Sequence, residues 1–156
     1  MTETKQEIKK PEEKVLAKGA EAHFATAKSL NLPISTKQSY EIANFIRGKK
    51  LARAKKMLQE VIEKKIAVPF KRYNRDTGHK KGKIAAGRYP EKASNAFLTL
   101  LNTAEANADS KGLDNENLVV CEVRSTQGSQ QWHAGRLRRR RMKRTHIYIK
   151  LEEAEK

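Results

Sequence analysis

Two strand-like segments near the carboxyl end of the chain, and the long polar segment between them, constrain the fold more than any other feature. Residues 118–123, LVVCEV, are rich in β-branched side chains, and residues 146–151, HIYIKL, alternate apolar and polar positions. The segment between them, residues 124–145, has no apolar periodicity and no proline. This order predicts a long antiparallel hairpin, about 35 Å in reach, with only its base in the core. An isolated ribbon of that length is marginal in water, so it needs a partner along its length.

The charge of the chain indicates what kind of partner this is. The 156 residues carry 34 Lys and Arg against 18 Asp and Glu, a net charge of +16. Such a charge favours a polyanion, which can be nucleic acid, an anionic membrane surface or an acidic protein. Residues 47–92 hold 16 cations and 4 carboxylates, residues 124–150 hold 9 and none, and residues 93–123 hold 1 and 5. A binding surface is therefore expected to draw on two separate basic blocks.

Three amphipathic helices are predicted ahead of these strands, over about residues 35–47, 50–65 and 90–111. In each, apolar side chains recur at helical spacing, which predicts one buried face per helix. The faces comprise Ile42, Phe45 and Ile46 in the first, Leu51, Ala54, Leu58, Val61 and Ile62 in the second, and Ala93, Ala96, Phe97, Leu100, Leu101, Ala104 and Ala108 in the third.

Boundary signals support these helices. Ser35 to Gln38 match a capping box, and Pro90 suits the first helical position of the third helix. Gly48 and Gly112 stand where the first and third helices are expected to end, because glycine tolerates the left-handed conformation that commonly follows a helix.

The predicted fold is α+β, with three helices packed on a small three-stranded antiparallel sheet and a long projecting β-hairpin. Residues 20–28 supply the third strand. One face of that strand is expected to comprise Ala20, Ala22 and Phe24. Residues 1–18 are mostly polar and are predicted to be a mobile tail. A single globular domain then spans residues 19–156, including the extended hairpin 124–145.

No motif predicts catalysis, a metal or a cofactor, so the protein is not expected to be an enzyme. Within the basic loop of residues 67–90, Gly78-x-x-x-Gly82-Lys83 lacks the spacing and the Ser or Thr of a phosphate-binding loop. Cys121, the single cysteine, is expected to be buried and inert within its strand. The histidines, which follow no metal-binding spacing, are His23, His79, His133 and His146.

The sequence also indicates a compartment. A single cysteine fits a reducing, intracellular environment. The first residues, MTETKQEIKKPEEK, lack the apolar segment of a secretory signal. The longest apolar stretches are far shorter than the ~20 residues that a membrane span requires. A cytoplasmic protein with no membrane partner is expected.

The arginine-rich segment of residues 136–144 has two interpretations. It is a solvated charge run or localisation signal, or it is a nucleic-acid contact held by the strand that follows it. Like charges on facing strands repel, whereas phosphates neutralise them and accept paired hydrogen bonds from guanidinium, so the second interpretation is favoured. Trp132 either packs on its own arm or stacks on a base, and Tyr73 and Tyr89 carry the same two alternatives.

Four stretches of the chain together resemble a known family: ISTKQSYEIANFIRGKKLARAKKML, VPFKRYN, GRYPEKASNAFLTLLNTAEANADSKGLD and RRRRMKRTHIYIKLEE. They are similar to the tunnel-lining large-subunit ribosomal protein, numbered twenty-two in bacteria and seventeen in eukaryotes. VPFKRYN and the loop of residues 71–89 resemble its archaeal and eukaryotic branch. The resemblance covers about residues 20–153; the tip sequence GSQQWHAG departs from the family, and the tail to Lys18 lies outside it.

The resemblance implies a small α+β domain docked on large-subunit ribosomal RNA near the exit of the peptide tunnel, with a hairpin that lines the tunnel wall. The implied partners are this RNA, neighbouring large-subunit proteins and the nascent polypeptide. The implied role is structural, in subunit assembly and translation on the cytoplasmic ribosome. The candidate tunnel-lining residues of the tip are Gln130, Gln131, Trp132, His133 and Arg136.

The two basic blocks supply the predicted RNA-binding residues. These are Arg47, Lys49, Lys50, Arg53, Lys56, Lys71, Arg72, Arg75, Lys80, Lys81, Lys83, Arg88, Arg124, Arg136, Arg138, Arg139, Arg140, Arg141, Lys143 and Arg144. Two other hypotheses stand beside this one. A basic nucleic-acid-binding protein acting off the ribosome is equally compatible with the net charge. An RNA-acting enzyme is supported only by scattered His and Glu residues.

Overall fold

The computed structural model describes residues 24–154. Its helices and strands follow one another along the chain in an order typical of α+β proteins. They are β1 (Phe24–Leu32), α1 (Thr36–Ile46), α2 (Leu51–Ile62), β2 (Val68–Pro69), β3 (Gly87–Arg88), α3 (Glu91–Asp109), β4 (Leu118–Gln127) and β5 (Thr145–Glu153), with short 3-10 turns η1 (Asn115–Asn117) and η2 (Gly135–Leu137). The N-terminal segment of residues 1–18, predicted as a tail, lies outside the described residues.

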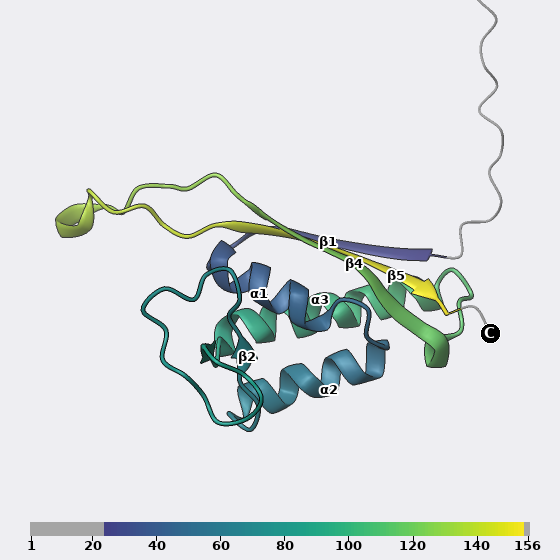
Figure 1. Cartoon of the computed structure of the whole chain (residues 1–156). Helices are drawn as coiled ribbons and strands as arrows, with labels where there is room; N and C mark the ends of the chain where they lie inside the picture. Colours follow the sequence, from purple (N-terminus) through teal and green to yellow (C-terminus); the bar gives the residue numbers. More distant parts are fainter. Residues whose placement is uncertain (1–23, 155–156) are drawn as a thin grey trace, which may run out of the picture.

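A three-stranded antiparallel sheet forms one layer of the molecule, in the order β1-β5-β4. The three helices cover one face of this sheet (Figure 1). Helix α3 packs mainly on β1 and α2, and α1 packs on β4. The prediction of three helices on a small antiparallel sheet is therefore confirmed. The two-residue pairing of β2 with β3, Val68 opposite Arg88, was not predicted.

The core lies between the sheet and the helices. On β5 the alternating side chains of Ile147, Ile149 and Leu151 are fully buried, as the period of two predicts. Phe97 of α3 is the largest fully buried side chain, and Leu101, one turn further along, is also fully buried. Burial of each such side chain contributes about 1.5–3 kcal/mol. Apolar packing between α3 and β5 therefore stabilises the centre of the fold.

The sequence pattern did not assign an inward face to the first strand, and the structure does. Ala25 and Ala27 are buried, whereas Phe24 is half-buried and its ring contacts the ammonium groups of Lys111 and Lys150 at 5.1 and 4.4 Å. Ala20 and Ala22, the other two residues of the predicted face, lie outside the described residues. The alternation of small Ala and Thr side chains is too weak to decide which face turns inward.

The helix ends agree with the glycine signals but not with the capping box. Gly48 and Gly112 have φ angles of 72° and 73°, the left-handed conformation expected after a helix. Ser35 is the N-cap of α1, yet its side chain makes no capping hydrogen bond, and its carbonyl accepts one from the Ser39 hydroxyl at 2.9 Å. Pro90 is the N-cap of α3, so this helix begins one residue later than predicted.

Residues 128–144, which we call the arm, connect β4 to β5 and extend away from the rest of the molecule, which we call the body (Figure 1). Regular pairing of β4 with β5 stops at Gln127 opposite Thr145. Within the arm, pairing is reduced to an isolated bridge between Trp132 and Arg141 and a few backbone hydrogen bonds. A long continuous β-hairpin is therefore not confirmed; the strands are regular only at its base.

The arm begins at a crowded glycine. A Cβ atom on Gly128 would lie 2.9 Å from Oδ1 of Asn31 and 3.2 Å from both Cβ of Arg144 and Nε2 of His146. The Gly128 N–H donates to the carbonyl of Arg144 at 2.9 Å. The absence of a side chain therefore lets the two sides of the arm start close together beside the end of β1.

Candidate nucleic-acid interface

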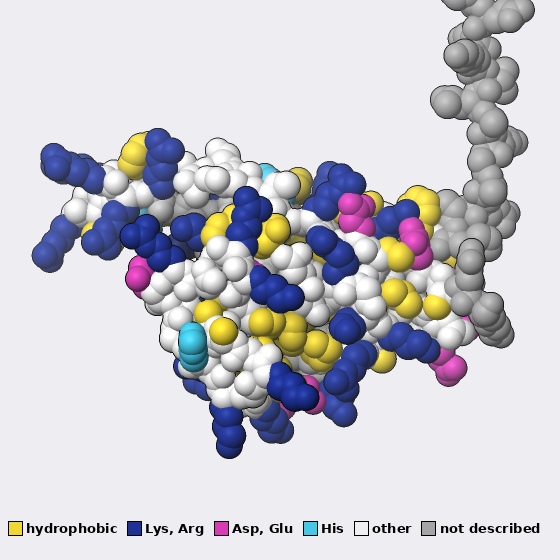
Figure 2. All heavy atoms as spheres, viewed as in Figure 1, with side chains coloured by type: hydrophobic (Ala, Val, Ile, Leu, Met, Phe, Trp, Pro, Cys, Tyr) yellow, Lys and Arg dark blue, Asp and Glu magenta, His cyan; other side chains and the backbone are white. Residues whose placement is uncertain are grey.

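The predicted RNA-binding side chains are all at the surface. Nineteen of the twenty are exposed, and Arg144 is half-buried. Figure 2 shows Lys and Arg side chains gathered along the arm and over the adjoining face of the body. The structure does not bring all of them together: one group lies on the turn between α1 and α2 and on α2 itself, a second lies in the segment before α3, a third lies on the arm, and Arg124 lies on β4.

The first group surrounds the turn between α1 and α2. This turn is fixed to the edge of β4, because the Gly48 N–H donates to the Val120 carbonyl at 2.8 Å and the Val120 N–H donates to the Lys49 carbonyl at 2.9 Å. The guanidinium of Arg47 donates to the Val123 carbonyl at 2.9 Å. Arg47 thus has a structural contact in addition to its exposure, which reduces its freedom to contact RNA.

The loop before α3 is fixed at its root by a buried carboxylate. Glu41 on α1 is 1% exposed and accepts hydrogen bonds from the backbone N–H groups of Lys71, Arg72 and Tyr73 at 3.2, 2.9 and 2.9 Å. A buried carboxylate is stable only when its charge is compensated in this way. Glu41 therefore determines the path of the chain into the basic loop, a role that the sequence prediction missed.

Aromatic rings hold the first cations of this loop. The Arg72 guanidinium lies 5.2 Å from the ring centre of Tyr40 and 5.5 Å from that of Tyr73, and the Lys37 ammonium lies 5.7 Å from that of Tyr73. Hydrogen bonds with Asn44 and Arg72 lower the pKa of the Tyr40 hydroxyl, and the hydrogen bond with Tyr40 raises the pKa of Arg72. Arg72 is thus held in place while its charge stays exposed.

A cavity of about 580 Å³ lies where the basic loop, the start of α1 and the base of the arm meet. We call it the cationic cleft. Its lining includes no Asp or Glu. Its five cationic lining residues are Lys37, Arg72, Arg75, Arg88 and Lys143. Four of these were predicted as RNA-binding; Lys37 was missed, because a lone lysine at a helix start carries no distinguishing sequence signal.

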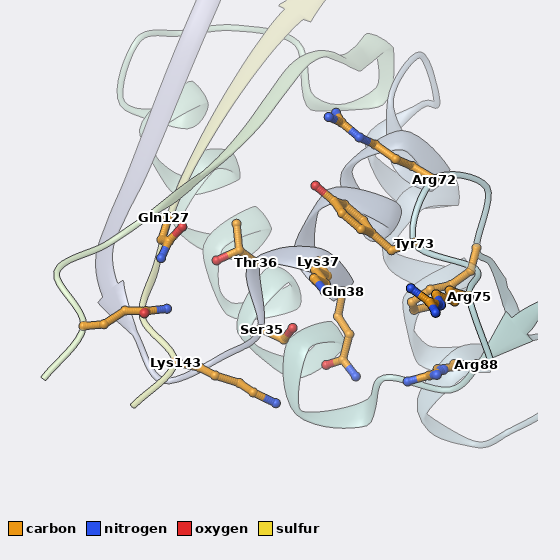
Figure 3. A pocket seen from close by; sticks show the side chains of 12 residues that line it. Ser35, Thr36, Lys37, Gln38, Arg72, Tyr73, Arg75, Arg88, Gln127 and Lys143 are labelled. Atoms are coloured by element: carbon orange, nitrogen blue, oxygen red, sulfur yellow. The ribbon is translucent and has the colours of Figure 1, made fainter. Parts of the chain in front are cut away.

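Side chains from three elements surround the cationic cleft. Figure 3 shows Lys143 of the arm on one side, Arg75 and Arg88 on the other, and Gln38 of α1 between them. Arg88 donates to the Thr77 hydroxyl at 3.0 Å and lies over the ring of Phe70 at 5.7 Å, which restricts its movement. The arrangement can bind an anion from several directions.

The predicted tip residues are spread along the arm from its base to η2. Gln130 lines the cationic cleft at the base of the arm. Gln131 and Arg136 are exposed, and His133 is half-buried. Trp132 packs on its own arm, with the Arg141 guanidinium 4.5 Å from its ring centre, yet 56% of the residue is exposed. Packing on the arm therefore leaves enough of the indole free for a stacking contact as well.

Tyr73 and Tyr89 also pack within the protein. Tyr73 forms an edge-to-face pair with Tyr40, with ring centres 5.7 Å apart, and the Lys80 ammonium lies 5.7 Å from the Tyr89 ring. Both tyrosines are half-buried. The intramolecular interpretation is thus supported for both, and part of each side chain remains accessible.

The prediction that Cys121 is buried was wrong, because Cys121 is exposed on β4. Cys121 follows the buried Val120 and therefore faces outward, at a point where the strand register shifts between Val120 and Glu122. Its thiol donates to Oε2 of Glu152 at 2.7 Å. Partial desolvation and this carboxylate raise the pKa of the thiol to about 11. It is therefore protonated and weakly nucleophilic at neutral pH.

Within residues 24–154, no group of three or more His, Cys, Asp or Glu side chains could hold a metal ion. His146 has a structural contact, because its Nδ1 accepts the backbone N–H of Asn31 at 3.1 Å. In the same part of the chain, no helix has the length and apolar character needed to cross a membrane.

Comparison with known proteins identifies the family. Residues 27–152 match the family described as ribosomal protein L22p/L17e. The large ribosomal subunit protein uL22 of Archaeoglobus fulgidus is 46% identical over 110 residues, which cover 69% of this chain and 71% of that protein. The uL22 proteins of Nanoarchaeum equitans and Ignicoccus hospitalis are 45% and 40% identical over 79% and 83% of this chain, and over 75% and 89% of their own lengths. The chain therefore belongs to the ribosomal protein L22p/L17e family, in its archaeal branch.

Proposed function

We propose that this protein is a structural constituent of the large subunit of the cytoplasmic ribosome and that it binds large-subunit ribosomal RNA. Its relatives carry the name large ribosomal subunit protein uL22. The observation that carries RNA binding is the arm, whose seven cations meet no Asp or Glu within the arm itself. Such a segment is stabilised by phosphates that neutralise it.

The RNA-binding surface comprises the basic loop before α3, the arm, Arg124 of β4, and the cations of the α1–α2 turn and of α2. All of these side chains are exposed except the half-buried Arg144. The cations contact phosphates and position the protein, whereas they read little of the base sequence. The exposed part of Trp132 provides a stacking surface for a base.

The arm acts as the extended hairpin that lines the peptide exit tunnel, with the body docked on RNA near the exit. Its extension away from the body, seen in Figure 1, and its lack of a buried apolar side chain support this role. The nascent polypeptide and neighbouring large-subunit proteins are then further partners. The role is structural and requires neither catalysis nor a cofactor.

The test is co-sedimentation of the tagged full-length protein from cell lysate through a sucrose gradient, with a high-salt wash. We expect the protein to remain with the large subunit after the wash, because contacts enclosed by RNA are screened less than open surface contacts. Release to the top of the gradient would contradict the proposal and favour non-specific nucleic-acid binding. A free basic protein added to the same lysate provides the control for loose charge.

A further inference from the structure

The cationic cleft joins two parts of the molecule that are far apart in sequence. Arg88 belongs to β3 in the body, and Lys143 belongs to the arm, yet both line the same cavity of about 580 Å³. This volume lies within the range of roughly 300–1,000 Å³ that ligand sites usually have. Figure 3 shows the two side chains approaching the cleft from opposite sides.

Within residues 24–154, four of the five cations that line the cleft form no ion pair with a carboxylate; they are Lys37, Arg72, Arg88 and Lys143. Among the described residues, the only carboxylate that pairs with Arg75 is the adjacent Asp76, at 3.9 Å, and both side chains are more than 90% exposed. Positive charges gathered in a concave surface repel each other and raise the local concentration of anions. The cleft is therefore incomplete without an anion.

We propose that the cationic cleft is a binding site for adjacent backbone phosphates of one RNA segment, which Arg88 and Lys143 contact from opposite sides. This inference rests on the proposed function and assigns one site within that surface. The RNA segment bridges the arm and the body at the cleft. It thereby fixes the direction of the arm where the regular strand pairing has just ended, at Gln127 and Thr145.

The residues around the cleft are arranged in advance for this contact. Thr145 links the start of α1 to β5, because its hydroxyl lies 2.9 Å from that of Thr36 and donates to the Ile34 carbonyl at 3.0 Å. Arg88 is restrained by Thr77 and Phe70. Restrained cations lose less side-chain entropy when a phosphate binds, which increases affinity. The first turn of α1 adds its positive dipole end at the same wall of the cleft.

The test is a double-mutant cycle on the full-length protein with purified archaeal large-subunit ribosomal RNA, at fixed salt near 150 mM. The variants are Arg88→Gln, Lys143→Gln and the double variant. Each single change is expected to weaken binding about tenfold, as the loss of one charged hydrogen-bond donor does. If both side chains bind the same phosphates, the double variant also weakens binding only about ten- to twentyfold, because the first change already removes the phosphates from the cleft.

A second cycle provides the matched control. It combines Arg88→Gln with Arg139→Gln, which removes the same number of charges but pairs the cleft with the outer part of the arm. Those two effects should multiply to about a hundredfold, because distant sites act independently. The pair Lys64→Gln and Lys65→Gln, on exposed side chains already paired with Glu91 and Glu63, should change affinity less than threefold.

The outcomes separate this inference from the function on which it rests. Multiplicative effects of Arg88→Gln and Lys143→Gln, equal to those of the control cycle, would contradict a phosphate-binding site shared by the two side chains and leave RNA binding intact. Equal affinity of the unchanged protein for ribosomal RNA and duplex DNA would contradict the proposed function, and with it the RNA phosphate-binding site in the cationic cleft. Circular dichroism of each variant verifies that the body is still folded.

Discussion

The body and the arm differ in how much of each is buried and in how much charge each carries. In the body, Phe97, Ile149 and their neighbours are fully buried, and polar groups such as Glu41 are satisfied internally. In the arm, residues 128–144 carry seven cations, none of their apolar side chains is buried, and few backbone hydrogen bonds join the two sides. The body can therefore specify its own structure, whereas on the proposed function the arm depends on the phosphates that it would contact.

Removing the outer arm should produce the largest effect on RNA affinity. It should leave the body folded, which distinguishes the roles of the two regions. Replacing residues 129–142 with Asn-Gly leaves a three-residue hairpin loop of Asn, Gly and Lys143 between Gly128 and Arg144, and removes five arginines. Affinity for large-subunit ribosomal RNA should fall by roughly three orders of magnitude, and the slope of log K against log salt should become shallower by about 3.5–4.5. Filter binding across a salt series measures both quantities.

The same variant tests the independence of the body. Its helical circular dichroism should be unchanged and its melting temperature should shift by only a few degrees, because no buried apolar side chain is removed. A large loss of helical signal would show that the arm is part of the cooperative unit, and the comparison of the two regions would then be invalid.

A truncation in each region should give the next largest effect. Phe97→Ala leaves a cavity beneath the sheet and should lower the free energy of unfolding by about 3–5 kcal/mol. Leu137→Ala, on a side chain that is 44% exposed in the arm, should change it by less than about 0.5 kcal/mol. Denaturant titration followed by circular dichroism compares the two. Similar losses would contradict the assignment of the core to the body.

Glu41→Ala should have an intermediate effect, at the point where the body controls part of the interface. The change leaves the N–H groups of Lys71, Arg72 and Tyr73 without their acceptor, and should cost about 3 kcal/mol of stability. Protease cleavage within residues 74–86 should also accelerate, because the root of the basic loop is released. Glu63→Ala, at an exposed side chain, is the control and should do neither.

Most of the body could be predicted from the sequence because apolar periodicity reports directly on burial. The three helices and the strands β4 and β5 follow from it, and Ile147, Ile149 and Leu151 are buried as expected. The orientation of β1 could not be predicted, because its Ala and Thr side chains differ little in hydrophobicity. The pairing of β2 with β3 could not be predicted either, because two residues give no period.

The candidate site could be predicted only as a list of cations. The sequence shows that Arg88 and Lys143 belong to basic blocks, but their meeting in one cleft depends on packing between distant segments. Glu41 did leave a signal, because it is a carboxylate beside Ile42 on the apolar face of α1, a position where only a compensated charge is stable. A charged residue at a core position is therefore worth testing as a structural anchor.

The smallest effect should come from the contact between Trp132 and Arg141, which tests whether the free arm has structure of its own. A cation–π contact at an exposed site contributes about 0.5–1 kcal/mol, so Arg141→Gln should leave the denaturation midpoint of the body unchanged. Trp132 is the only tryptophan, and its fluorescence should change in this variant, because the guanidinium leaves its ring face. A loss of more than about 1 kcal/mol in the free energy of unfolding of the body would instead mean that the arm folds together with the body. With Arg141 unchanged, quenching of Trp132 on addition of ribosomal RNA would indicate that the exposed part of the indole stacks on a base.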